Sequence, residues 1–454
     1  MSASADTSRD PGERERHLLG LAGAIVQASP ADETEVLLAD GREFLTRFAS
    51  SRIHQNVGAE EASAVVRVVV DRRIGVATAD SLEDDALTAA RESALAIAEA
   101  SEPDPDWPSL PGPRPVKPVK AYHRATALAT AQTRADFAAA VIAAAREKDG
   151  EAAGIVQIEE GSLAVVNSRG VAVATSHTRA ETNALVTCGD GSGWADGVAM
   201  RLSDLDPGRV GKRAALTAEK SRNPKPLEPG RYDVVLEPSA VAEWVQYLAY
   251  VAFSGKDFDE GQSPLAGRLG EKVTGEQVTL WDNGRDHRTL PQPFDYEGQP
   301  ARQLSLIREG VAEGVATNYY RARRLGKRVS TGHALPASSS YECMPMHLFM
   351  KGGEASAKQL VGEMERGLLV TRFHYTNVLD PMQTVLTGMT RNGTFWVENG
   401  RISHAVRNLR YTENVLAALG RIDGMSKRLR RVPGPCVVPT VRMRGVQFSG
   451  ATEF

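Results

Sequence analysis

Residues 232–284, YDVVLEPSAVAEWVQYLAYVAFSGKDFDEGQSPLAGRLGEKVTGEQVTLWDNG, decide the fold of the second half of the chain. They open with a short apolar strand, residues 232–237. Pro238 then fits the first turn of a helix, where its missing N–H is not needed. Apolar residues follow on one helical face, which predicts a core helix: Val241, Trp244, Val245, Leu248, Val251 and Ala252. We expect Gly255 to cap its C-terminal end.

An acidic segment with Asp257, Asp259 and Glu260 follows the predicted helix. Clustered carboxylates bind hard cations, but this spacing lacks the remaining ligands of a calcium loop. We therefore expect a solvated acidic turn, followed by a glycine-punctuated segment and a strand, VTLWD, at residues 278–282.

The order strand, helix, SPLAGRLGEKVTGEQVTLWDNG (263–284) resembles the C-terminal domain of the TldD/PmbA family, and two further segments continue the likeness. These are PFDYEGQPARQLSLIREGVAEGVATNYYRARRLG (293–326) and STGHALPASSS (330–340). The family is implicated in peptide processing and was once named for modulating DNA gyrase. The resemblance implies an α+β chain: an α/β N-terminal domain at 16–229 and a strand-rich C-terminal domain around a central helix at 230–454.

The resemblance also predicts which branch of the family the chain joins. TldD-type members bind zinc through two histidines of an HExxxH helix and a later cysteine, and PmbA-type members, also called TldE, lack this site. Here Gln246, Tyr247 and Val251 occupy the HExxxH positions, and the opening stretch holds no histidine. No cysteine lies near Met425 and Ser426, where the family's third ligand is expected. Since zinc needs strong N, S or O ligands, the resemblance implies a metal-free subunit with no catalytic residue and no cofactor of its own.

The composition is that of a soluble globular protein. Of 454 residues, 42% are hydrophobic and 24% charged, and the formal net charge is −3. That balance argues against a general nucleic-acid binder. The three cysteines, Cys188, Cys343 and Cys436, are odd in number and far apart, which favours a reducing cytoplasm. No apolar run reaches membrane-spanning length and the polar N-terminus is no signal peptide.

The sequence of the first half of the chain predicts a mixture of helices and strands. We expect a disordered tail at residues 1–15 and a helix at 16–27. Asp40-Gly41 predicts a hairpin turn between two strands. The proline-rich segment EPDPDWPSLPGPRPVKP, residues 102–118, predicts a semi-rigid connector. The alternative is a proline-rich ligand for another protein.

Three residues are candidates for a peptide-binding cleft. Arg321 opens a basic run, RARRLGKR, that suits a peptide carboxylate or an acidic patch on a partner. The alternative is a solvated charged segment. His333 and Ser338 lie in the segment that resembles the family's cleft lining.

Cys343 and His347 form a further pair at helical spacing that could hold a metal. Pro345 between them opposes a continuous helix. A nucleophilic pair of Cys343 with His333 or His347 is a second possibility. The ordinary expectation is a half-buried cysteine and a surface histidine.

The function implied by the resemblance is that of a metal-free TldE/PmbA-like subunit in a heteromeric TldD/TldE-type zinc metallopeptidase. Such a pair processes or degrades small or unfolded peptides, including leader regions of modified peptide antibiotics. The expected partner is a TldD-type HExxxH-bearing homologue that carries the zinc. We expect a dimer whose contact comes mostly from the C-terminal domain, because strand edges need covering, and no nucleic-acid or membrane partner. Two alternatives are an independent or peptide-tailoring enzyme with a non-zinc site, and a non-catalytic binding scaffold.

Overall fold

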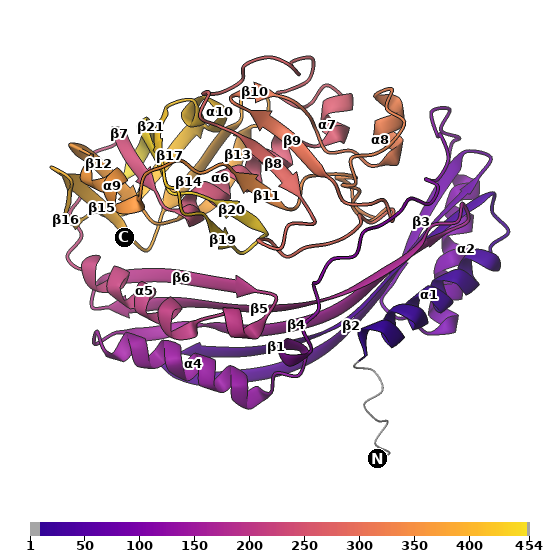
Figure 1. Cartoon of the computed structure of the whole chain (residues 1–454), viewed down its shortest axis with the longest axis horizontal. Coiled ribbons are helices and arrows are strands. Elements are labelled where there is room, and N and C mark those ends of the chain that lie inside the picture. Colours follow the sequence, from indigo (N-terminus) through magenta and orange to yellow (C-terminus); the bar gives the residue numbers. More distant parts are fainter. Residues whose placement is uncertain (1–9, 452–454) are drawn as a thin grey trace.

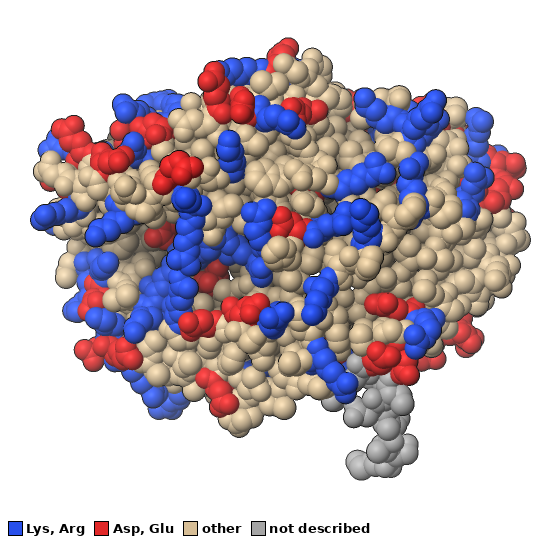
Figure 2. All heavy atoms as spheres, in the orientation of Figure 1, with Lys and Arg blue, Asp and Glu red and all other residues tan. Residues whose placement is uncertain are grey.

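The computed structural model describes residues 10–451 (Figure 1). One long curved sheet carries helices on its outer face, and the C-terminal half of the chain lies against the opposite face. The fold is of the α+β class, as the sequence predicts. Among the helices of residues 10–451, none is both long and apolar enough to cross a membrane. Basic and acidic side chains are interspersed over the face in Figure 2.

The first sheet is antiparallel and six-stranded, in the order β3-β2-β1-β4-β5-β6. Its strands are β1 (Glu33–Ala49), β2 (Arg52–Val70), β3 (Arg73–Ala79), β4 (Glu151–Asn167), β5 (Ala172–Cys188) and β6 (Gly191–Ala199). Two pairs of helices bury its outer face: α1 (Pro11–Gln27) and α2 (Asp84–Ala100) at one end, α4 (Ala131–Arg146) and α5 (Pro207–Lys220) at the other. Short helices lie at α3 (Arg124–Ala127) and η2 (Leu202–Asp204).

The predicted hairpin at Asp40-Gly41 is wrong, because both residues lie inside β1. The strand pairs along its length with β2 on one side and with β4 on the other. These two ladders satisfy the backbone on both sides and outweigh a local turn preference. Ser50 and Ser51 form the turn instead, with φ of 48° and 54°. Gly41 serves close packing, since a Cβ there would lie 2.9 Å from the Glu160 carbonyl oxygen.

The first helix begins earlier than predicted. It starts at Pro11, so five residues assigned to a disordered tail are helical. The Asp10 carboxylate accepts a hydrogen bond from the Gly12 N–H, and Pro11 and Glu13 suit the first turn. The rest of the predicted tail, residues 1–9, lies outside the described residues.

The proline-rich segment 102–118 contains no helix beyond a turn and no strand. It contacts both halves of the chain. The Trp107 indole donates a hydrogen bond of 2.9 Å to Glu33 of β1 and stacks on Tyr320. The Gln299 amide donates to the Gly112 carbonyl at 3.1 Å. The segment therefore fastens the first sheet to the C-terminal half.

The C-terminal half contains two sheets. The nine-stranded sheet consists of β7 (Gly230–Leu236), β12 (Arg366–Val370), β13 (Phe373–Asp380), β14 (Val385–Thr390), β15 (Thr394–Glu398), β16 (Arg401–Ala405), β17 (Leu409–Asn414), β18 (Ile422–Met425) and β21 (Val441–Ala451). The six-stranded sheet consists of β8 (Leu280–Asn283), β9 (Gln303–Arg308), β10 (Val311–Ala312), β11 (Leu348–Met350), β19 (Arg430–Val432) and β20 (Cys436–Val438). The C-terminal half also contains short helices: α7 (Gly255–Asp259), α8 (Tyr319–Arg324), α9 (Ala357–Gly362) and α10 (Val415–Leu419).

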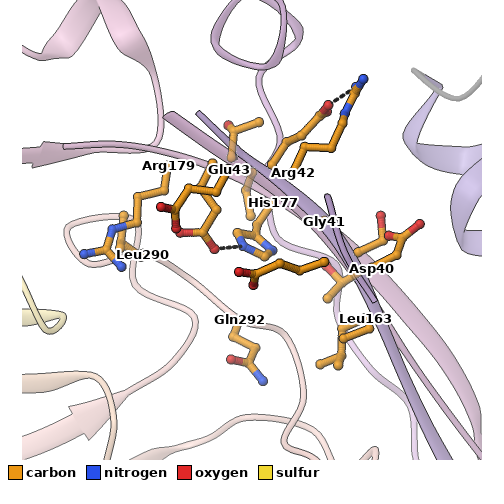
Figure 3. Close-up of a pocket in the computed structure, with 18 of the residues that line it drawn as sticks. Asp40, Gly41, Arg42, Glu43, Leu163, His177, Arg179, Leu290 and Gln292 are labelled. Atoms are coloured by element: carbon orange, nitrogen blue, oxygen red, sulfur yellow. Dashed lines mark hydrogen bonds and ion pairs between the residues drawn. The ribbon is translucent and has the colours of Figure 1, made fainter. Parts of the chain in front are cut away.

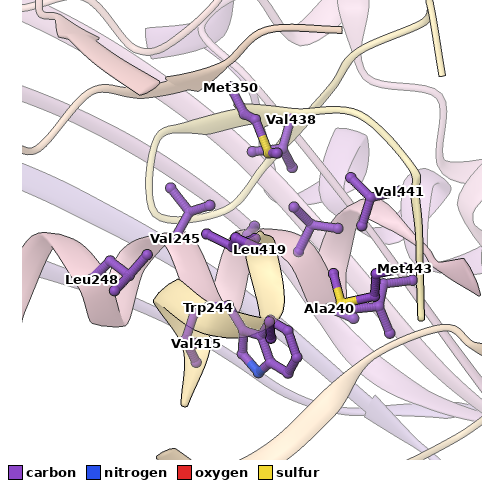
Figure 4. Close-up of a cluster of buried hydrophobic side chains, with 14 of the residues drawn as sticks. Ala240, Trp244, Val245, Leu248, Met350, Val415, Leu419, Val438, Val441 and Met443 are labelled. Carbon is purple, nitrogen blue, oxygen red and sulfur yellow. The ribbon is translucent and has the colours of Figure 1, made fainter. Parts of the chain in front are cut away.

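Helix α6 (Pro238–Val251) is the central helix that the sequence predicts. Its apolar face is buried against residues from both C-terminal sheets (Figure 4). Trp244 is fully buried and stacks on Phe373 at a centroid distance of 5.3 Å. This burial explains the apolar spacing of the sequence.

The predicted C-cap at Gly255 is wrong. Helix α6 ends at Val251, and Ala252 donates the capping hydrogen bond to Leu248. Gly255 instead begins α7, where a Cβ would lie 2.3 Å from the Ala316 carbonyl oxygen. Glycine is needed there because two chain segments approach closely, and this signal is invisible in the local sequence.

Candidate functional site

The residues at the vacated metal positions of α6 serve structural contacts. The Gln246 side-chain amide donates hydrogen bonds to the carbonyls of Pro433 (3.2 Å) and Gly434 (2.7 Å). The Tyr247 hydroxyl donates to the Thr376 carbonyl. Val251 is buried in the core. None of these three side chains is a strong zinc ligand, so the three positions do not supply a zinc site.

A large cavity lies between the inner face of the first sheet and the C-terminal half. Its volume is about 780 Å³. Strands β1, β2, β4 and β5 supply one wall, and loops with Leu290, Gln292, His347 and Pro435 supply the other. Figure 3 shows Leu290 and Gln292 across from His177 and Arg179 of β5. Since Gln246 holds the neighbouring Gly434, α6 also positions this side of the cavity.

The strand wall of the cavity is rich in charge. Its charged side chains are Asp40, Arg42, Glu43, Glu60, Glu61, Glu159, Glu160, His177 and Arg179. Glu160 is fully buried and pairs with Arg42, and Glu159 lies 3.2 Å from His177. The hydrogen bond from His177 lowers the pKa of Glu159. Carboxylates outnumber cations, so the wall offers hydrogen-bond acceptors to a ligand.

Sequence reasoning missed these residues. The clearest signal was charge in the middle of strands, as in Asp40–Glu43, where β1 faces solvent-filled space rather than core. The predicted turn at Asp40-Gly41 hid the charged residues of this strand, because polar residues are expected in a turn.

The three predicted cleft residues are not brought together at the cavity. Ser338 is exposed, and none of Arg321, His333 and Ser338 lines the large cavity. The Arg321 guanidinium is buried and donates to Glu342 (2.8 Å), Asp259 (2.8 Å) and Glu260 (2.7 Å).

The Arg321 contacts also correct the predicted acidic turn. Asp259 and Glu260 are both ion-pair partners of a buried arginine; the Asp259 side chain is 9% exposed, whereas Glu260 stays exposed to solvent as expected. Burial lowers the pKa of the Arg321 guanidinium, but the hydrogen bonds that it donates to Glu342, Asp259 and Glu260 raise the pKa more. Its donors are therefore occupied within the chain and are not free for a peptide carboxylate.

His333 lies one layer beneath the large cavity. Its Nε2 is 2.9 Å from Asp282 Oδ1, and its Nδ1 is 3.0 Å from the Thr331 hydroxyl. The other Asp282 oxygen accepts the His347 backbone N–H at 2.5 Å. Burial lowers the pKa of His333, but the adjacent Asp282 carboxylate raises it more. His347, whose Nε2 meets the Leu290 carbonyl at 3.0 Å, connects this buried layer to the cavity wall.

Family models match three segments of the chain, which together cover most of it. They are the PmbA/TldA metallopeptidase domain 1 (residues 34–98), the central domain (127–222) and the C-terminal domain (229–450). The chain belongs to the PmbA/TldD family. This confirms the family that the sequence resemblance predicts.

Relatives of this PmbA/TldD chain are distant in sequence. A metalloprotease from Methanothermobacter thermautotrophicus is 25% identical over 61% of this chain and 62% of its own length. The metalloprotease PmbA homologue of Buchnera aphidicola is 24% identical over 52% of this chain and 50% of its own. The match therefore spans about half to three fifths of these two relatives.

Solved structures share the whole fold. TldE from Thermococcus kodakarensis superimposes with a TM-score of 0.86 at 24% identity, covering 96% of this chain and 99% of its own. A putative modulator of DNA gyrase from Thermotoga maritima gives a TM-score of 0.84 at 22% identity, covering 96% and 100%.

Cys343 of this PmbA/TldD chain is not arranged as a nucleophile. Burial raises the pKa of its thiol to about 12, so the thiolate is scarce at neutral pH. Within the described residues, both nitrogens of His333 and Nε2 of His347 lie within hydrogen-bond distance of other groups. Cys343 and His347 are both buried, which corrects the expectation of a half-buried cysteine and a surface histidine.

A buried charge cluster joins the first sheet to the C-terminal half of the PmbA/TldD fold. The Arg67 guanidinium donates to Glu35 of β1 at 2.7 Å and to Glu297 at 3.2 Å. Burial raises the pKa of Glu35 to about 7, although Arg67 opposes the shift. The folded chain therefore keeps a proton on Glu35 at a pH where an unfolded chain, with an ordinary pKa of 4.5, has lost it.

This shift predicts a pH-dependent stability. A raised carboxyl pKa contributes stability that is fully present below about pH 4.5 and is lost as pH rises through about 7. Glu35→Gln is uncharged at every pH. Wild type should thus lose about 1–3 kcal/mol relative to the variant between pH 4.5 and 7.5. Urea unfolding midpoints across this range measure the difference. Glu61→Gln, at an exposed carboxylate, is the control, and parallel curves for Glu35→Gln and wild type would contradict the assignment.

Proposed function

We propose that this chain is the metal-free, TldE/PmbA-like subunit of a heteromeric TldD/TldE-type zinc metallopeptidase that acts on small or unfolded peptides. One observation carries the proposal. The helix on which the family's other branch bears HExxxH here bears Gln246, Tyr247 and Val251, which are committed to backbone hydrogen bonds and to the core. The metalloprotease names of the relatives and the likeness to a TldE fold support it.

The chemistry of peptide hydrolysis explains why catalysis would fall to the partner and substrate positioning to this chain. Cleavage at neutral pH needs an activated water and donors for the developing oxyanion. Since the HExxxH positions of α6 hold no strong zinc ligand and Cys343 offers no accessible thiolate, the proposal assigns the activated water and the oxyanion donors to the TldD-type partner. This chain contributes the walls of the cavity, and positioning a substrate can by itself supply several kcal/mol of barrier lowering. Its three free, buried cysteines fit a reducing cytoplasm.

An independent enzyme centred on Cys343 is the second candidate. The high pKa of that thiol, the two occupied nitrogens of His333 and the occupied Nε2 of His347 count against it. The third candidate function is a binding scaffold without a peptidase partner. It differs from the proposal only in whether peptide cleavage appears when a partner is added.

The metal content tests the metal-free part of the proposal. We expect the purified chain to hold no stoichiometric zinc after dialysis, because its α6 positions are not ligands. Elemental analysis measures this directly. The proposal fails if about one zinc per chain is found and is lost in His333→Ala or His347→Ala, since the metal would then sit on ligands of this chain.

A further inference from the structure

The floor of the large cavity is one face of the first sheet. One row of residues in register crosses β2, β1, β4 and β5, and all four of its members line the cavity: Glu61, Gly41, Gly161 and His177. Residues in register on neighbouring strands share a face of the sheet. The row therefore crosses the floor with a carboxylate at one end, an imidazole at the other and two glycines between them.

The two glycines leave the centre of the floor without side chains. Gly41 and Gly161 are paired on β1 and β4, and a Cβ at Gly161 would lie 2.8 Å from Cε1 of His177. A ligand can approach the bare backbone of the sheet at this point. The Gln292 side chain lies across the cavity from His177 (Figure 3). The volume of about 780 Å³ falls in the usual range of ligand sites.

Carboxylates surround this open centre. Glu43 and Glu159, in the next row on the same face, lie directly opposite each other on β1 and β4, and Glu61 is diagonal to Glu43. Directly opposed residues have Cβ atoms about 4.5–5.5 Å apart and diagonal neighbours are about 7–8 Å apart, and like charges directly opposite each other are destabilising. A cation placed among the three carboxylates would relieve this repulsion.

The arginines that line the floor are engaged elsewhere. Arg42 pairs with Glu160 on the other face of the same strands (Figure 3), because alternate residues of a strand point to opposite faces. Arg179 lies opposite Glu159 but donates its hydrogen bond to Glu181. Neither guanidinium is therefore a hydrogen-bonded partner of the carboxylates at the open centre.

Two of the three carboxylates keep an uncompensated charge. Glu159 has His177 as its partner, at 3.2 Å. Within residues 10–451, the ion pairs formed along β1 and β2 involve other carboxylates, so Glu43 and Glu61 are left without a basic partner. The floor thus offers acceptors of negative charge to a group that enters the cavity.

We propose that this floor binds a cationic group of an extended peptide, an ammonium or a guanidinium, over the glycine pair and among Glu43, Glu61 and Glu159. Such groups donate charge-assisted hydrogen bonds to carboxylates, which are about twice as strong as neutral ones. The inference rests on the proposed function, because it names the class of peptide that the cavity receives: basic peptides in preference to acidic or uncharged ones. The cation can belong to the peptide's N-terminus or to a lysine or arginine side chain.

Peptide binding to this chain alone tests the proposal, with fluorescence anisotropy as the readout and a chelator present so that no metal ion fills the site. One pair of flexible Gly/Ser probes has a blocked N-terminus and carries either lysines or acetylated lysines. A second pair lacks lysine and has either a free or an acetylated N-terminus. We expect at least one cationic probe to bind about tenfold or more tightly than its uncharged match, because only the cation gains charge-assisted hydrogen bonds. The pair that shows the difference identifies the source of the cation.

Neutral variants locate the binding site on the floor. Glu43→Gln with Glu61→Gln keeps the shape of both side chains, and it should abolish the advantage of the cationic probe while leaving the uncharged probe unchanged. Glu99→Gln, at an exposed carboxylate of α2 on the outer face, is the matched control and should bind like wild type. Circular dichroism checks that the variants are folded.

Three results would overturn the inference: no binding of any probe, equal binding of cationic probes and a glutamate-rich probe, or a cationic advantage that survives the double substitution. Peptide cleavage plays no part in these measurements. A mixture with the HExxxH-bearing homologue that fails to cleave peptides would thus contradict the proposed function, whereas cleavage without charge-selective binding would contradict this inference alone.

Discussion

We expect this chain alone to leave an unstructured peptide intact and to support its cleavage once an HExxxH-bearing homologue is added. This expectation follows from the proposed role as a metal-free subunit. Gln246, Tyr247 and Val251, at the HExxxH positions of helix α6, are not strong zinc ligands, and burial raises the pKa of the Cys343 thiol to about 12. The measurement is release of a fluorescent peptide fragment by each chain and by the mixture. The expected difference between mixture and single chain is at least about a hundredfold, since positioning alone contributes several kcal/mol.

A matched pair of variants separates positioning from chemistry. Gln246→Ala removes the hydrogen bonds to Pro433 and Gly434 that hold one side of the cavity, so it should slow cleavage by the mixture. Arg366→Ala, at an exposed ion pair with Glu398 at the start of β12, should not slow cleavage. Equal effects of the two substitutions would show that the α6 contacts do not shape the cavity.

The second large effect concerns stability. We expect Arg321→Ala to destabilise the chain by about 3–5 kcal/mol, because removing one member of a buried ion network leaves the others unpaired. Asp259 would keep its ion pair with Arg324 and Glu342 the one with Lys256, but Asp259, Glu260 and Glu342 would all lose their shared buried cation. The shift of the urea unfolding midpoint measures the loss.

A surface ion pair supplies the control for Arg321. Arg366→Ala breaks a pair whose arginine side chain is 71% exposed, and such pairs contribute about 0–1 kcal/mol. If Arg321→Ala shifts the midpoint no more than Arg366→Ala does, the Arg321 network is not a buried structural unit. If Arg321→Ala instead abolished peptide cleavage without lowering stability, the result would support Arg321 as a residue of the peptide-binding cleft.

Helix α6 was predictable because its cause is local. Burial on one face imposes a spacing of apolar residues that can be read without a partner, and Pro238 marks its start. The family resemblance rested on such segments and was confirmed by models covering most of the chain.

The failures share a different cause, which is distance along the chain. Asp40-Gly41 looks like a turn until β4, more than a hundred residues later, is known to pair with it. The basic run at Arg321 looks solvated or ligand-binding because its carboxylates lie at Asp259, Glu260 and Glu342. Long-range pairing decides both cases, and local propensity cannot reveal it.

The most direct test of the subunit role is a titration of the HExxxH-bearing homologue with this chain, followed by peptide cleavage with and without a zinc chelator. The account predicts that cleavage rises to a plateau as this chain is added, that the chelator abolishes it, and that this chain alone shows none. Chelator-resistant cleavage by this chain alone would contradict the account.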